Sequence, residues 1–314
     1  MNTLKKLITG ANGFVGSALC AELRHRGTPV VASVRRKEFD AQYEIGDITA
    51  NTNWKSALEG CDTVFHLAAR VHLMNDTSND PLASFRATNV DATLNLAQQA
   101  AEANIKRFVF ASSVKVNGEE TFNKPFLASD DPHPVDPYGQ SKLEAEIALK
   151  ELSLSSGMEV VIIRPPLVYG PGVRANFLRL MQLVQWNVPL PLGAIHNARS
   201  MVSLDNLVDF LVICGQHPNA AGEIFMVSDD NDVSISQLLR LIASAMGKKI
   251  FLPPIPSKLI EVCAGISGKT AIANRLLGSL QVDIEHTKLT LNWQPVESLQ
   301  QAIAKTVAHF QRQH

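Results

Sequence analysis

The chain has 314 residues, and 46% of them are hydrophobic, so a core of ordinary size can form without disulfides or a metal site. The 29 Lys and Arg residues balance 30 Asp and Glu residues to a net charge of −1, which argues against a nucleic-acid-binding surface. The four cysteines lie far apart in the sequence, which is typical of buried thiols in a reducing compartment. No signal peptide precedes the first expected strand, so we expect a cytoplasmic protein.

Short β-branched runs alternate with helical patterns over the first 165 residues. Strands are expected at residues 6–9, 29–34, 63–67, 108–111 and 159–163, and helices at 14–25, 82–103 and 138–152. The strands are apolar on both faces, as a parallel sheet covered by helices on both sides requires. This alternation predicts a doubly wound α/β domain of the Rossmann type over residues 1–165.

The pattern changes after Pro165, where proline and glycine cluster at residues 170–172 and 189–193. Residues 166–314 are expected to form mostly a smaller lobe that caps the carboxyl edge of the sheet, with some return of the chain to the sheet. The most apolar stretch, residues 259–266, is too short to span a bilayer. It is expected to form a buried helix, and a helix that lies on a membrane or a partner is the alternative. No integral membrane segment is therefore predicted.

A glycine-rich turn follows the first expected strand and opens the first expected helix. The pyrophosphate of a dinucleotide needs a tight turn, an unobstructed backbone and free N–H groups at a helix N-terminus. Glycine triplets also occur in ordinary tight turns, but this position favours dinucleotide binding. The predicted cofactor contacts in the turn are Gly10, Asn12, Gly13, Phe14, Val15 and Gly16.

The end of the second expected strand bears on which dinucleotide is bound. An acidic residue there would bind the ribose 2′-hydroxyl of NAD, but Val34 is followed by Arg35 and Arg36. Guanidinium groups suit a 2′-phosphate, so the pattern favours NADP(H). NAD stays an alternative, because a solvated basic loop would have the same residues.

Tyr138 and Lys142 begin an expected helix and are four residues apart, which places them on one helical face. A phenol titrates near 10, so acid–base work at neutral pH needs its pKa lowered by about three units. A nearby ammonium and an oxidised nicotinamide ring both favour the phenolate. Ser113 lies at the end of a strand, where its hydroxyl can hold the reacting oxygen. We predict that these three residues are catalytic and that Tyr138 and Lys142 also contact the cofactor.

The glycine turn, Ser112-Ser113 and the Tyr138–Lys142 pair together resemble the extended short-chain dehydrogenase/reductase family. The resemblance is to its sugar-nucleotide epimerase, dehydratase and reductase branch, and it runs almost end to end. It implies a C-terminal lobe that binds a UDP-sugar, and a homodimer formed through the helices at residues 82–103 and 138–152.

The same resemblance assigns contacts outside the turn. It implies that Asp47 and Ile48 lie near the adenine and that Pro165 borders the nicotinamide. It further implies that Asn176 and Arg199 bind the nucleotide diphosphate and that Ser113 contacts the sugar. The strand end that flanks the cofactor is implied to be Leu67, Ala68 and Ala69.

The resemblance leaves the reaction open. Sugar-nucleotide dehydratases carry an Asp-Glu pair directly after the catalytic Ser or Thr, but Val114 and Lys115 stand here, so dehydration is not expected. Residues 66–72, 113–118 and 164–177 resemble UDP-glucose 4-epimerase-like proteins. That group includes reductases of UDP-4-keto-6-deoxy-N-acetylglucosamine, which form UDP-N-acetylquinovosamine for surface polysaccharides.

Two reactions and one non-enzymatic role are therefore carried forward. Arg35 and Arg36 favour the 4-ketoreductase, and the alternative is a 4-epimerase of UDP-glucose or UDP-N-acetylglucosamine. A non-catalytic cofactor-sensing protein is a remote alternative, because such proteins usually lose the catalytic Tyr or Lys and this chain keeps both.

Overall fold

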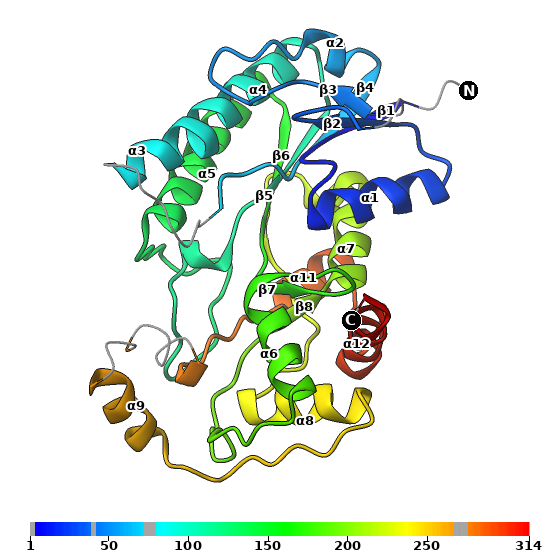
Figure 1. Ribbon diagram of the computed structural model, residues 1–314. Helices are drawn as coiled ribbons and strands as arrows, with labels where there is room; N and C mark the ends of the chain where they lie inside the picture. The colour runs from blue at the N-terminus through cyan, green and yellow to red at the C-terminus, as the bar shows by residue number, and fades with distance from the viewer. Residues whose placement is uncertain (1–3, 39–41, 72–79, 267–269, 271–275, 314) are drawn as a thin grey trace.

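The computed structural model describes residues 4–38, 42–71, 80–266, 270 and 276–313. Within these residues, seven parallel strands form one sheet in the order β3-β2-β1-β4-β5-β6-β9 (Figure 1). The strands are β1 (Lys5–Thr9), β2 (Val30–Val34), β3 (Gln42–Glu44), β4 (Cys61–His66), β5 (Arg107–Ala111), β6 (Glu159–Arg164) and β9 (Ile224–Met226). The predicted doubly wound parallel sheet is confirmed.

The strand order reverses at β1, which pairs with β2 on one side and with β4 on the other. Thr9 at the end of β1 is in register with Ser33 of β2 and with His66 of β4. In an open parallel sheet, ligands bind outside the carboxyl ends of the strands at such a switch point. The topology therefore places a binding crevice beside the glycine turn.

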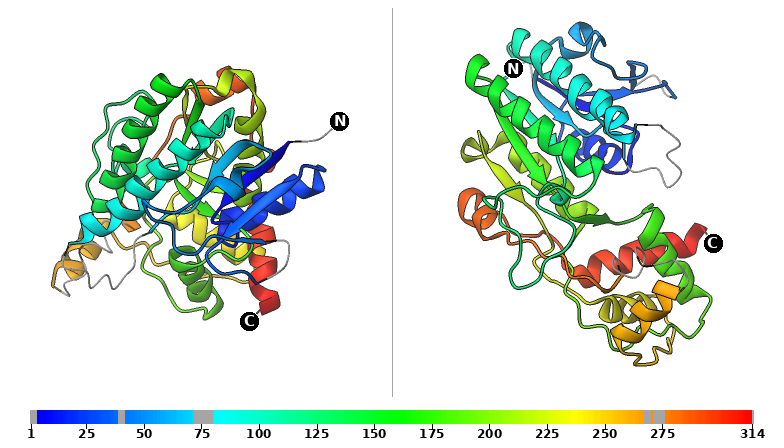
Figure 2. Two further views of the ribbon diagram at one scale, coloured as in Figure 1. Left: turned by 90° about the horizontal axis from the view of Figure 1, so that it is seen from above. Right: turned by 90° about the vertical axis from the view of Figure 1, so that its left-hand side faces the viewer.

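Helices cover both faces of the sheet (Figures 1 and 2). One face carries α1 (Phe14–His25) and α7 (Leu204–Gln216), and the other carries α2 (Lys55–Leu58), α4 (Ala92–Glu102) and α5 (Pro137–Ser156). Successive strand residues point to opposite cores, because side chains alternate along a strand. Leu7 packs with α4 and α5, whereas Ile8 packs with α1 and α7.

The single helix predicted at residues 82–103 is interrupted. The structure has α3 (Pro81–Arg86), one π-helical turn (Ala87–Asp91) and then α4. The side-chain amide of Asn89 in this turn donates hydrogen bonds to the Arg70 carbonyl (3.1 Å) and to the Ser141 hydroxyl (3.0 Å). The π turn therefore connects the loop after β4 to α5.

The C-terminal lobe lies below the sheet in Figure 1 and has its own hydrophobic core, which includes Phe177, Leu239 and Phe310. β9 returns from this part of the chain to the sheet beside β6. The division into two domains at residue 165 stays a prediction. The elements of the lobe are β7 (Leu167–Tyr169), α6 (Ala175–Gln185), β8 (Met201–Ser203), α8 (Ile235–Ala245), α9 (Ser257–Ile266) and α12 (Leu299–Gln313). A further helix, α11 (Glu285–Leu291), packs against β9 and the core of the sheet.

The helix expected to be buried at residues 259–266 forms as α9, but the expectation of burial was wrong. Ile260 packs against the core of the lobe, while Leu259, Val262 and Ile266 are exposed. No helix among the described residues is long and apolar enough to cross a membrane. Cys20 and Cys214 are buried and Cys61 is half-buried, whereas the side chain of Cys263 lies outside the described residues.

Candidate active site

The glycine turn after β1 is packed too tightly to admit side chains. Gly10 has a φ of +66°, and a Cβ on Gly16 would lie 2.1 Å from the Gly10 carbonyl oxygen. A Cβ on Gly10 would lie 3.0 Å from the backbone nitrogen of Ala68. This bare backbone opens directly into the N-terminus of α1, so the residues present fit the pyrophosphate of a nicotinamide dinucleotide.

The ends of β1 and β4 are tied together beside this turn. The backbone N–H groups of Leu67 and Ala68 donate to Thr9 Oγ1 at 3.1 and 3.2 Å. His66 bonds to Thr9 (2.8 Å) and Thr93 (2.9 Å), and burial lowers its pKa to about 3. His66 is thus a neutral, satisfied core histidine that orders the strand end flanking the predicted cofactor site.

A cavity of about 490 Å³ lies against the turn. Asn12, Gly13 and Phe14 line it on one side, and the loop after β7 lines it on the other with Pro171 and Arg174. Predicted cofactor residues of the turn therefore face open space.

At the end of β2, Arg35 forms an ion pair with Asp47, with 2.7 Å between Nε and Oδ1. Both side chains are about three-quarters exposed, at 75% and 76%. The structure thus joins a residue predicted to bind a 2′-phosphate to one predicted to lie near the adenine. Arg36 is exposed and Ile48 is half-buried in the same region.

The three predicted catalytic residues come together where β5 ends and α5 begins. Lys142 Nζ donates to the Ala111 carbonyl at 2.7 Å and lies 4.4 Å from the ring centre of Phe110. The Ser113 side chain lies close enough to the Tyr138 phenol to lower its pKa, against the effect of burial. The first turn of α5 is capped by Asp136, whose carboxylate accepts from the Gly139 N–H at 2.7 Å.

Burial shifts the pKa values of the helix pair in opposite directions. It raises the pKa of Tyr138 to about 12, with Asp136 adding to the rise and Ser113 opposing it. Burial also lowers the pKa of Lys142 to about 7, and the Glu146 carboxylate opposes this shift. Tyr138 is therefore a neutral phenol in the chain alone, and the positive charge of an oxidised nicotinamide ring beside it would favour the phenolate.

Lys115 occupies a position where dehydratases carry a carboxylate, and here it has a structural role. Its ammonium pairs with Glu119 (2.7 Å) and with Asp136 at the start of α5. The loop that carries Ser113 is thereby fastened to the helix that carries Tyr138.

Glu146 and Arg164 were not predicted as site residues, but they form a buried ion pair, and the Glu146 charge acts on Lys142. Glu146 also accepts a hydrogen bond from Ser112. The sequence spacing could have indicated Glu146, because it follows Lys142 by four residues and so lies on the same helical face.

The two predicted diphosphate ligands lie in the C-terminal lobe. Asn176 is exposed in the first turn of α6. Arg199 is half-buried, and its Nη1 donates to the Gly278 carbonyl at 2.9 Å. Burial lowers the pKa of Arg199, and the Glu120 carboxylate opposes this shift. No contact links these two residues directly, so their joint role stays a prediction.

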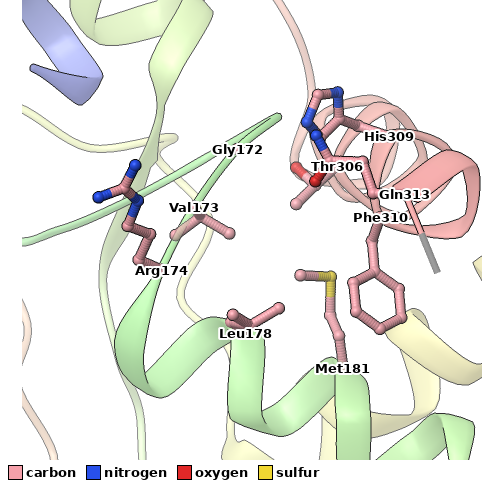
Figure 3. A pocket seen from close by; sticks show the side chains of 9 residues that line it. All are labelled: Gly172, Val173, Arg174, Leu178, Met181, Thr306, His309, Phe310 and Gln313. Atoms are coloured by element: carbon pink, nitrogen blue, oxygen red, sulfur yellow. The ribbon is translucent and has the colours of Figure 1, made fainter. Parts of the chain in front are cut away.

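A second cavity, of about 280 Å³, separates the loop after β7 and α6 from α12 (Figure 3). Arg174 and His309 stand on its two sides above an apolar floor that includes Leu178 and Met181. The catalytic trio does not line this cavity, so it lies apart from the predicted chemistry.

A parallel sheet with a dinucleotide turn at its switch point, and a Ser-Tyr-Lys trio at the same edge, define a nicotinamide-dependent enzyme of the extended short-chain dehydrogenase/reductase type. The sequence matches the NAD dependent epimerase/dehydratase family over residues 6–228, and the chain belongs to this family. The resemblance inferred from the motifs is therefore confirmed.

Individual relatives agree with this assignment. The chain is 46% identical over 310 residues to a UDP-glucose 4-epimerase of Vibrio cholerae, a match that covers 97% of this chain and 94% of that protein. The solved structure of MoeE5 in complex with UDP-glucose and NAD matches with a TM-score of 0.79 at 25% identity, over 98% of this chain and 99% of that one. A UDP-glucuronic acid 4-epimerase from Bacillus cereus in complex with NAD shares the fold, with a TM-score of 0.80 at 21% identity over 99% of both chains.

Proposed function

We propose that the chain is a UDP-sugar 4-epimerase. The sequence favoured a 4-ketoreductase and kept the 4-epimerase as the alternative, and we now prefer that alternative. The observation that carries the proposal is the joining of Ser113, Tyr138 and Lys142 at the carboxyl edge beside the glycine turn. Retention of Tyr138 and Lys142 in this arrangement argues for an enzyme over a cofactor sensor. The Vibrio cholerae relative supports the epimerase over the reductase.

The glycine turn would hold NAD, which would supply a reversible hydride acceptor at C4 of the sugar. Hydride lost from one face of C4 would return to the other face after the 4-keto sugar turns over. Tyr138, as the phenolate, accepts the proton of the C4 hydroxyl and later gives it back. Lys142 stabilises the phenolate through its charge, and Ser113 orients the reacting oxygen by hydrogen bonding. Because hydride leaves and returns, the cycle consumes no reductant.

We propose NAD as the working cofactor in place of the NADP(H) expected from Arg35 and Arg36. The ion pair with Asp47 offsets the charge of Arg35, so Arg35 would attract a 2′-phosphate less strongly than a free arginine. The contacts with the glycine turn, with Leu67–Ala69 and with Pro165 are proposed with the same cofactor.

For the substrate, we propose that Asn176 and Arg199 bind the UDP diphosphate from the C-terminal lobe. An arginine fork suits phosphate oxygens, and release of Arg199 from its neighbours would make it available. We also propose a homodimer through the face formed by α4 and α5, where Ile147 and Leu154 are exposed. Sedimentation equilibrium would give the mass of the assembly.

The decisive experiment incubates the purified chain and catalytic NAD with UDP-glucose or UDP-N-acetylglucosamine and follows the C4 epimers by NMR. Epimer formation without added reductant, lost in Tyr138→Phe, is the expected result. A parallel reaction contains UDP-4-keto-6-deoxy-N-acetylglucosamine and NADPH. Stoichiometric NADPH oxidation there, together with no epimer from either UDP-sugar, would instead establish the 4-ketoreductase.

A further inference from the structure

The end of α6, the segment after α8 and α9 lie at the lower end of the C-terminal lobe in Figure 1. Figure 2 shows the same ribbon from two further sides. Large apolar side chains on these segments are exposed. They come from the end of α6 and its loop, from the segment after α8, and from α9. We call this set the apolar patch: Trp186 (65% exposed), Val188 (41%), Phe251 (68%), Leu259 (53%), Val262 (58%) and Ile266 (85%).

Direct contacts join the first two of these segments, and α9 begins six residues after Phe251 in the chain. Lys248 Nζ donates to the Gln185 carbonyl at 2.5 Å, next to Trp186 in the chain. The Leu190 N–H donates to the Phe251 carbonyl at 3.2 Å. On α9 the exposed apolar residues are spaced by three and four positions, which places them on one stripe of the helix. An ordinary surface helix has polar residues on such a stripe.

The charge on the segments that carry the patch is mainly positive. Residues 185–190 and 247–266 contain three lysines and one acidic residue, whereas the whole chain has 29 Lys and Arg residues and 30 Asp and Glu residues. Lys248, Lys249 and Lys258 are exposed beside the patch, and the single acidic residue is Glu261 on α9.

We propose that the apolar patch docks the protein on an anionic lipid surface. Exposed Trp and Phe side chains partition into the interface of a bilayer, and lysines around them bind acidic headgroups while their stems stay apolar. A second copy of the chain is a poor occupant, because a two-fold contact would place like-charged lysines opposite one another. A free nucleotide would account for the lysines but not for the exposed apolar stripe. The proposal is independent of the reaction at C4.

The test is co-sedimentation of the full chain with vesicles. Vesicles of phosphatidylglycerol and phosphatidylethanolamine are compared with vesicles of phosphatidylcholine alone, at low and at high salt. We expect binding to the anionic vesicles only, weakened by salt. Leu259→Glu combined with Val262→Glu should reduce the partition coefficient at least about tenfold, because it replaces buried apolar area with like charge at the lipid surface.

The matched control is Leu289→Glu combined with Val296→Glu, which removes two exposed apolar side chains elsewhere and adds the same charge. Its binding should equal that of the wild type, and both double variants should keep C4 activity. Equal vesicle binding by the two double variants overturns the proposal, as does no binding by the wild type. Displacement from vesicles by UDP would place the headgroup in the nucleotide site instead. If the wild type does not bind vesicles and the double variant Leu259→Glu and Val262→Glu forms a smaller oligomer than the wild type, the patch is instead a contact between copies of the chain.

Discussion

Arg164 and Glu146 form a two-pronged ion pair, with 2.6 Å between Nη2 and Oε2 and 3.0 Å between Nε and Oε1. Both side chains are 2% exposed, and the pair lies where β6 meets α5. Arg164 also donates to Asn117 at 3.0 Å, in the loop that follows Ser113. The pair therefore couples the helix of Tyr138 and Lys142 to the loop of Ser113.

Removing the charge of Glu146 should destabilise the fold. Glu146→Gln leaves the Arg164 guanidinium buried without its counter-charge, which costs about 3–5 kcal/mol of unfolding free energy. Urea denaturation followed by circular dichroism measures the loss. The control is Glu144→Gln, two residues earlier, whose ion pair with Arg86 is partly exposed to solvent and should contribute less. Similar unfolding curves for the two variants would contradict this account of the pair.

Tyr138→Phe should reduce kcat by about 10²–10⁴-fold, because it removes the group that exchanges the C4 proton. Binding of NAD should change little, since the glycine turn is untouched. NMR of samples quenched at successive times gives the rate of epimer formation, and titration calorimetry gives the Kd for NAD. Tyr43→Phe, on β3, is the control and should keep full activity. Wild-type turnover by the Tyr138 variant would remove the phenol from the mechanism.

Lys142 should make stability depend on pH. Its pKa is lowered from 10.5 to about 7 in the folded chain, so between these values the unfolded chain binds more protons than the folded one. Stability contributed by this group is therefore present at high pH and is lost as pH falls toward 7, by up to a few kcal/mol. Comparing the unfolding free energy of wild type with that of Lys142→Met, without added cofactor, isolates the effect. A difference that stays constant from pH 7 to 10 would show that Lys142 keeps its ordinary pKa.

The pair of Arg35 and Asp47 predicts the cofactor preference. Wild type should bind NAD more tightly than NADP, and Asp47→Asn should strengthen NADP binding about two- to fivefold by freeing Arg35 from its partner. Titration calorimetry gives all four Kd values. Adding Arg35→Gln to the Asp47→Asn variant should abolish this gain in NADP affinity. Tighter binding of NADP by the wild type would restore the preference expected from the arginines alone.

Gly16→Ala should prevent cofactor binding, because its Cβ would overlap the Gly10 carbonyl at 2.1 Å. Gly265→Ala is the control, because nothing lies within 4 Å of a Cβ there. NAD binding by fluorescence titration should vanish in the first variant and stay normal in the second. Normal binding by Gly16→Ala would mean that the turn has room that the structure does not give it.

Local patterns were sufficient to predict much of the fold and the core of the candidate site. The predicted helix at residues 14–25 coincides with α1, and each of the five predicted strands overlaps an observed one. The glycine turn and the Tyr138–Lys142 spacing also depend on neighbours within a few residues. Backbone conformation and helical faces follow from such short-range rules. The same rules missed β3 and α2, which are too short to have a clear period.

Contacts between distant segments could only be decided by the tertiary structure. The Arg164–Glu146 pair, the Arg35–Asp47 pair and the contact of Asn89 with Ser141 join residues 12 to 52 positions apart. The exposure of α9 likewise depends on which segments pack against it, and its own sequence reads equally well as a buried helix. Burial and ion pairing depend on segments that are distant in sequence and meet only in the folded chain. A short stretch of sequence therefore cannot predict them.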